Sequence, residues 1–114
     1  MPYHQRDLVN VSKTLPDGTT LPHPFLIISC RSANSIENYY TGVMMTASNT
    51  TDIFSFLVSD LMFESPLEKN NCQFRLYIIV SFRECDIKSF KNRMKKVHFK
   101  AVADQIKDYV LSLD

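Results

Sequence analysis

Two residues that could act together on a ligand stand on one predicted strand. In Cys72–Phe82 every even position from Phe74 onward is apolar, whereas Arg75 and Tyr77 occupy odd positions. Strict alternation of this kind is typical of a β-strand with one face in a core. Arg75 and Tyr77 therefore share the outward face, two residues apart, where they could contact the same ligand or partner surface. The alternative is a structural pair, a surface arginine beside a half-buried tyrosine.

A second candidate for chemistry is a basic block near the end of the chain. Between Asp86 and Asp104 there are six cations and no acid, although the formal net charge of the whole chain is only +1. Such a block attracts phosphates or an acidic protein segment. Solvated helix starts and loops have the same composition, so charge alone leaves both interpretations open. The six cations are Lys88, Lys91, Arg93, Lys95, Lys96 and Lys100.

The spacing of the cysteines, histidines and glycines limits the kinds of binding site that the sequence predicts. Three cysteines and three histidines are scattered without CxxC spacing, which favours neither a disulfide framework nor a local metal site. A zinc site would need long-range assembly. Cys30 and Cys72 flank apolar strand patterns, so we expect both to be small buried thiols. With only Gly18 and Gly42, the chain has no Gly-rich phosphate loop.

The elements that must position these residues are short strands. The segment between Arg31 and Asn38 is polar and is expected to be a loop with at most one helical turn, and Pro66 limits any helix before it to about one turn. Asp86 to Met94 is interpreted as a turn and a short irregular strand. In the long loop from Ser12, Pro16-Asp17-Gly18 predicts a turn. The predicted strands are Arg6–Val11, Pro24–Ser29, Tyr39–Thr46, Ile53–Val58 and Cys72–Phe82.

The apolar period changes near the C-terminus. From about Val97 apolar residues recur at steps of three and four, which predicts one amphipathic helix without a good N-terminal cap. Strands followed by one helix predict a mainly β chain, a small, mostly antiparallel barrel or half-barrel with a C-terminal helix packed on it, in a single domain over 1–114. The expected inward-facing helix residues are Phe99, Val102, Ile106, Tyr109, Val110 and Leu113.

Composition places the chain among ordinary globular proteins. Its 114 residues are 45% hydrophobic and 22% charged, enough for one modest core. No apolar run approaches the length of a bilayer span, and the first ten residues lack the apolar block of a signal peptide. We therefore expect a soluble, cytoplasmic protein with no membrane contact.

The order of the motifs resembles the MazF/PemK/Kid toxins, the endoribonucleases of type II toxin–antitoxin pairs. The resemblance spans nearly the full chain, and each motif is a short apolar strand with one or two polar residues. It ends with a helix after Lys95-Lys96. The matching segments are Asp7–Val9, Pro24–Ser29, Gly42–Ser48, Phe56–Val58 and Gln73–Leu76.

The resemblance implies an SH3-like barrel, a homodimer and metal-independent, cofactor-free cleavage of single-stranded RNA. In such sites the ribose 2′-hydroxyl attacks the adjacent phosphate and leaves a cyclic phosphate and a free 5′-hydroxyl. That chemistry needs a base, an acid and donors for the charge that builds on phosphorus. The partner implied in such pairs is an antitoxin with an acidic, disordered tail.

The resemblance also implies catalytic candidates. Thr46 and Ser48 match the family's hydroxyl position after the third strand, and Arg75 matches an arginine whose fork suits phosphate oxygens. His23 stands where many members carry arginine, and Tyr77 where some carry an acid. Because histidine exchanges protons near neutrality, His23 could act as base or acid while Arg75 holds charge.

Further residues are candidates for contact with the RNA substrate, and the sequence also allows a second function. We expect Arg6, Tyr77, Lys95 and Lys96 to contact RNA. Because of the two departures from the family pattern, the alternative is a non-catalytic barrel of the same fold that binds nucleic acid or an antitoxin peptide.

Overall fold

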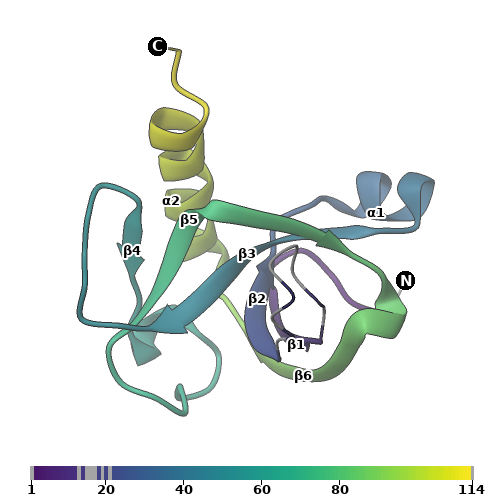
Figure 1. Ribbon diagram of the computed structural model, residues 1–114, viewed down its shortest axis with the longest axis horizontal. Coiled ribbons are helices and arrows are strands. Elements are labelled where there is room, and N and C mark those ends of the chain that lie inside the picture. Colours follow the sequence, from purple (N-terminus) through teal and green to yellow (C-terminus); the bar gives the residue numbers. More distant parts are fainter. Residues whose placement is uncertain (1, 13, 15–17, 19, 21, 114) are drawn as a thin grey trace.

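The computed structural model describes residues 2–12, 14, 18, 20 and 22–113. Its strands form one six-stranded antiparallel sheet in the order β4-β5-β3-β2-β1-β6, strongly curved in Figure 1. In the described part of the chain β4 and β6 are edges and the sheet is open, not a closed barrel. The strands are β1 Asp7–Val11, β2 His23–Ile27, β3 Tyr40–Ala47, β4 Ser55–Leu57, β5 Cys72–Phe82 and β6 Ile87–Arg93.

Two helices accompany the sheet. The predicted terminal helix is confirmed: α2 spans Lys96–Gln105 and continues as a π-helical turn, Ile106–Val110. Its N-cap residue, Lys95, makes no side-chain capping bond, as expected for that uncapped start. The segment expected to be a loop is instead helix α1, Arg31–Glu37, anchored by its one buried residue, Asn34. No helix among the described residues is long and apolar enough to cross a membrane.

Both faces of the sheet are buried, which explains why the run around Phe25 is apolar without alternation. One face packs against α2 through Val102 and Ile106. The other face lines the inside of the curved sheet and includes Phe25, Tyr40 and Phe82. Successive residues of β1 and β2 serve opposite faces, because side chains alternate along a strand.

Strand β5 does not keep the alternation that its sequence predicts. Its pairing with β3 shifts between Val43 and Met44, whose partners are Ile79 and Arg75, so three residues of β5 bulge out of register. After the bulge the strand presents Val80 and Phe82 to the inner cluster instead of the α2-side cluster. The even positions before and after the bulge therefore belong to different cores.

The segment from Asp86 is a turn and an irregular strand, as expected: a 3₁₀ turn over Glu84–Asp86 precedes β6, whose pairing with β1 shifts register at two places. Other smaller expectations are wrong. Cys30 is exposed, whereas Cys72 is buried as expected. Leu113 is 99% exposed because the helix ends before it. Pro16 and Asp17 of the predicted turn lie outside the described residues.

Candidate functional site

Cross-strand pairing places Thr46 and Arg75 on the same face of the sheet. In the β3–β5 ladder Met44 is opposite Arg75, and Thr46 is opposite Gln73. Directly opposed residues point to the same side of a sheet, and so do residues two apart on one strand. Thr46 and Arg75 are therefore diagonal neighbours, about 7–8 Å apart at their Cα atoms.

The same register brings His23 to this face. The β2–β3 ladder ends with Phe25 opposite Met44, so His23 and Thr46 lie two residues beyond its last pair, on the same face as Phe25 and Met44. Both residues line the same cavity, so they lie near each other past the end of the ladder. His23, Thr46 and Arg75 are all half-buried, at the end of the sheet where the inner core gives way to solvent. We call this surface the open face.

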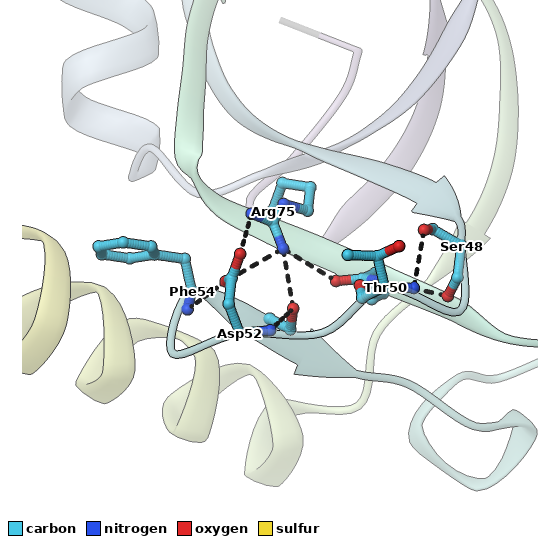
Figure 2. Close-up of polar contacts among 7 residues, drawn as sticks. Ser48, Thr50, Asp52, Phe54 and Arg75 are labelled. Carbon is cyan, nitrogen blue, oxygen red and sulfur yellow. Dashed lines mark hydrogen bonds and ion pairs between the residues drawn. The ribbon is translucent and has the colours of Figure 1, made fainter.

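Arg75 is held by a dense set of contacts (Figure 2). Its Nη2 donates to Asp52 Oδ2 at 2.8 Å, and its Nη1 donates to Asp52 Oδ1 at 3.2 Å, a bidentate ion pair. Nη1 also donates to Ser55 Oγ at 2.8 Å and to Gln73 Oε1 at 3.3 Å. The ion pair lowers the pKa of Asp52, with help from the Phe54 amide, and raises the pKa of Arg75. Both groups therefore stay charged.

Gln73 fastens the loop that carries Asp52. The side chain is fully buried, and its Nε2 donates to the carbonyls of Ser48 at 3.2 Å and Thr50 at 2.7 Å. The Ser48 hydroxyl accepts the amide of Thr50 at 3.1 Å, so it caps this loop (Figure 2). The loop from Ser48 to Ser55 is thus tied to β5 through Gln73 and Arg75.

Tyr77 lies next to Arg75, as predicted, although it is one of the three bulged residues of β5. The Arg75 guanidinium carbon is 5.1 Å from the centre of the Tyr77 ring. Phe54 meets the same ring edge-on, with centroids 5.5 Å apart. The expectation that Arg75 and Tyr77 share a face is confirmed.

A cavity of about 460 Å³ borders two of the candidates. His23 and Thr46 line it together with Asn10 and Lys91, whereas Arg75 and Ser48 do not. Much of its wall comes from the opposite side of the sheet. Lys91 is half-buried there and pairs with Glu68 at 3.0 Å. The site is therefore defined by the strand register and not by this cavity.

The remaining candidates divide between two places. Arg6 and Lys96 line a separate cavity of about 780 Å³, together with Arg93 and Lys100. Arg6 has a positive φ of 80° and donates through Nη1 to the carbonyl of Met94 at 3.1 Å. Lys95 is exposed just before α2 and is not part of that cavity.

Sequence reasoning missed Asp52 and Gln73. Asp52 follows a stretch of small polar residues, which indicates only a turn, and nothing in that stretch reveals a partner on β5. Gln73 stands at an odd position of an alternating strand and was expected to face outward. Its burial depends on the loop that folds over it.

Comparison with solved structures identifies the fold. A chain of the MazE–MazF structure from Deinococcus radiodurans has a TM-score of 0.74 at 11% identity, over 99% of each chain. The Mycobacterium tuberculosis toxin MazF-mt6 has a TM-score of 0.68 at 15% identity, over 96% of this chain and 99% of that chain. A mycobacterial endoribonuclease in complex with its cognate antitoxin has a TM-score of 0.72 at 9% identity, over 98% of each chain.

Sequence comparisons add no relative to these structural ones. No protein-family model matches the chain, and no curated protein matches it. The structural matches nevertheless extend over nearly the whole chain, from strand β1 to helix α2. The chain therefore has the fold of the MazF-type endoribonuclease toxins, as the order of its sequence motifs predicts.

Proposed function

We propose that this chain is a toxin-type endoribonuclease that cleaves single-stranded RNA on the open face without a metal ion. The observation that carries the proposal is the strand register, which sets His23 and Thr46 on neighbouring strands with Arg75 diagonal to Thr46. A base, a hydroxyl donor and a guanidinium are the groups that a transesterification at phosphorus uses. Fold similarity to endoribonuclease toxins supports this reaction class by analogy.

The proposed reaction assigns one role to each side chain. The 2′-oxygen attacks the adjacent phosphorus while its proton passes to the imidazole of His23. The bond between phosphorus and the 5′-oxygen breaks, and that oxygen takes a proton from water, to which His23 later returns its own. Thr46 donates a hydrogen bond to a phosphate oxygen, and Arg75 balances the charge that develops there. The products are a 2′,3′-cyclic phosphate and a 5′-hydroxyl.

Arg75 can take this role only if the phosphate replaces Asp52 on its fork. The carboxylate and a phosphodiester offer similar paired oxygens to a guanidinium. Because the Asp52 side chain is half-exposed, the exchange does not require the core to open. Ser48, whose hydroxyl caps the same loop, would change partners when the loop moves.

Protein partners follow from the same proposal. Two structural neighbours were solved with an antitoxin, and we expect an antitoxin with an acidic segment here. Among the described residues, those that line the cavity with Arg6, Arg93, Lys96 and Lys100 include no acid, which suits such a segment or an RNA backbone, although Arg93 pairs with Asp7 and Lys100 with Asp104. We further propose a homodimer, in which Lys95 of each copy lies near the bound chain.

The test is incubation of the purified protein with a long single-stranded RNA in excess EDTA. We expect the parent to cleave, and His23→Ala and Arg75→Ala to lose cleavage by about 10²-fold or more while remaining folded. His4→Ala and Arg31→Ala are matched controls, because both side chains are exposed away from the open face. Equal cleavage by all variants would show that the assignment is wrong.

One observation favours the alternative of a non-catalytic binding barrel. The Arg75 fork is already occupied by Asp52, Ser55 and Gln73. If the ion pair persists when RNA binds, the open face lacks a cation for the transition state. RNA binding without cleavage at any pH between acidic and alkaline values would establish this alternative.

A further inference from the structure

We infer that Tyr77 forms a stacking subsite for a nucleobase of single-stranded RNA, next to Arg75 on the open face. The inference rests on the proposed function, because it adds a subsite to the same substrate tract. The subsite would contact the flat face of an unpaired base. It would not read the hydrogen-bonding edge that distinguishes one base from another.

The edge strand β4 runs beside Arg75, and Phe54, just before it, reaches Tyr77. Ser55 of β4 is opposite Arg75 of β5, and the amide of Leu76 donates to the carbonyl of Phe54 at 2.9 Å. Before Ser55 the chain turns, with the Ser55 amide donating to the Asp52 carbonyl at 3.1 Å, and Phe54 packs against the Tyr77 ring. Tyr77 lies two residues from Arg75 on β5, one step further from Thr46.

The Tyr77 ring is fixed but not covered. The Arg75 guanidinium lies over the ring, and Phe54 meets its edge. Tyr77 nevertheless remains 54% exposed, so Arg75 and Phe54 leave about half of its surface open to a ligand. A ring already held by two neighbours loses little conformational entropy when a base stacks on it.

The neighbouring apolar surface extends this platform. Ile53 is 67% exposed, and Leu57, opposite Gln73 on the same face, is 61% exposed. Exposed apolar side chains along one edge of a sheet, together with an exposed ring, indicate a contact surface. The position of the Tyr77 ring beside a guanidinium that can meet phosphate fits RNA, which presents an apolar base and an anionic backbone within each nucleotide.

Continuity with the proposed cleavage centre distinguishes RNA from a second protein copy as the occupant. The row of side chains from His23 through Thr46 and Arg75 to Tyr77 crosses three neighbouring strands without leaving the open face. A single strand lying along this row would put one phosphate at Arg75 and an adjoining base on Tyr77. A protein interface centred on Ile53 would instead bury Arg75 and Asp52 together.

The test measures binding separately from cleavage. A fluorescent 2′-O-methyl oligoribonucleotide of mixed sequence lacks the attacking hydroxyl, so its anisotropy reports affinity alone. The variants are Tyr77→Phe, which keeps the ring, and Tyr77→Leu, which keeps apolar bulk without a ring. Tyr39→Ala is the matched control, because Tyr39 is 45% exposed just before β3, at the end of that strand away from Thr46. Thermal unfolding confirms that each variant is folded.

We expect Tyr77→Leu to raise the Kd at least about fivefold, and Tyr77→Phe and Tyr39→Ala to change it by less than about twofold. An equal Kd for Tyr77→Leu and Tyr77→Phe would overturn the stacking inference. So would a parent protein that does not bind the oligonucleotide. A smaller assembly mass for Tyr77→Leu in light scattering, at unchanged affinity, would assign the surface to contact between copies instead.

The two proposals fail in different ways. If the parent cleaves RNA and Tyr77→Leu binds and cleaves as the parent does, the subsite is wrong and the nuclease proposal stands. If the parent binds the oligonucleotide through Tyr77 but does not cleave RNA, the subsite stands and the nuclease proposal is wrong.

Discussion

The guanidinium of Arg75, on β5, donates two hydrogen bonds, of 2.8 and 3.2 Å, to the carboxylate of Asp52 in the loop before β4. This pair joins the loop, the open face and the Tyr77 ring, because Arg75 contacts all three. If the chain binds RNA as proposed, an RNA phosphate and the Asp52 carboxylate compete for the same guanidinium of Arg75. Such competition would make Asp52 a determinant of RNA affinity, because its carboxylate carries the same negative charge as the phosphate and pairs with the same guanidinium.

Removing the competing charge should strengthen RNA binding. We expect Asp52→Asn to lower the Kd for a 2′-O-methyl oligonucleotide about two- to fivefold, because an exposed ion pair offers modest resistance to exchange. The dependence of affinity on salt should become steeper, since one more cation is available to phosphate. Anisotropy titrations at several salt concentrations measure both effects. Asp108→Asn, an exposed acid in the terminal helical turn, is the control. Weaker binding by Asp52→Asn would contradict the competition.

The same ion pair predicts a pH dependence of stability. The folded protein lowers the pKa of Asp52 below its ordinary value of 3.8. The ionised carboxylate therefore contributes its full share to folding stability above pH 3.8, and this share is lost as the pH falls through the lower pKa of the folded state. The parent should therefore melt at a higher temperature than Asp52→Asn at pH 6, and the difference should shrink below about pH 4. A difference that stays constant down to pH 2 would show that the charge of Asp52 does not stabilise the fold.

Gly42 is predicted to be the least replaceable position of β3. A Cβ there would lie 2.8 Å from Phe82 Cε1 and 3.1 Å from the backbone oxygen of Leu26, inside the inner core. We expect Gly42→Ala to destabilise the protein by about 1–3 kcal/mol, the usual range for overpacking, in urea unfolding. Ala47→Val adds methyl groups to the exposed end of the same strand, and should cost less than about 0.5 kcal/mol. Equal stability of Gly42→Ala and the parent would mean that Phe82 moves aside freely.

The three thiols should react at two distinct rates. Cys30 and Cys85 are exposed, whereas Cys72 is buried and burial raises the pKa of its thiol. Because the thiolate is the reactive form, Cys72 should react far more slowly. A thiol-specific reagent followed by mass spectrometry should label two cysteines within minutes in the native protein and three after denaturation. Rapid labelling of Cys72 in native buffer would show that β5 opens at its start.

Local patterns were enough to predict most of the fold. Apolar residues alternate in the strands and recur at steps of three and four in the terminal helix, and both patterns can be read within a single segment. Five strands and the terminal helix are therefore predicted close to their bounds. The open edges of the sheet and the bulge in β5 depend on how distant strands meet. The shift at Met44 is set by its partner strand, and no local pattern in β3 indicates it.

The candidate site was less accessible from the sequence. His23, Thr46 and Arg75 were proposed from motif order, and the register that sets them on one face became visible only with the paired strands. Asp52 and Gln73 carried no signal, because a loop aspartate and a strand glutamine are common surface residues. Both residues are hydrogen-bond partners of Arg75 in the folded chain. Candidate catalytic residues can be proposed from sequence, but their hydrogen-bond partners depend on tertiary contacts.

The most direct measurement is the chemistry of the cut ends. A defined single-stranded RNA is incubated with the protein in excess EDTA, and the fragments are analysed by mass spectrometry, beside the same sequence fully 2′-O-methylated. The account predicts fragments with 2′,3′-cyclic phosphate and 5′-hydroxyl ends from the RNA, none from the methylated strand, and none above background from His23→Ala. Fragments with 3′-hydroxyl and 5′-phosphate ends, or cleavage of the methylated strand, would contradict attack by the 2′-hydroxyl on the open face.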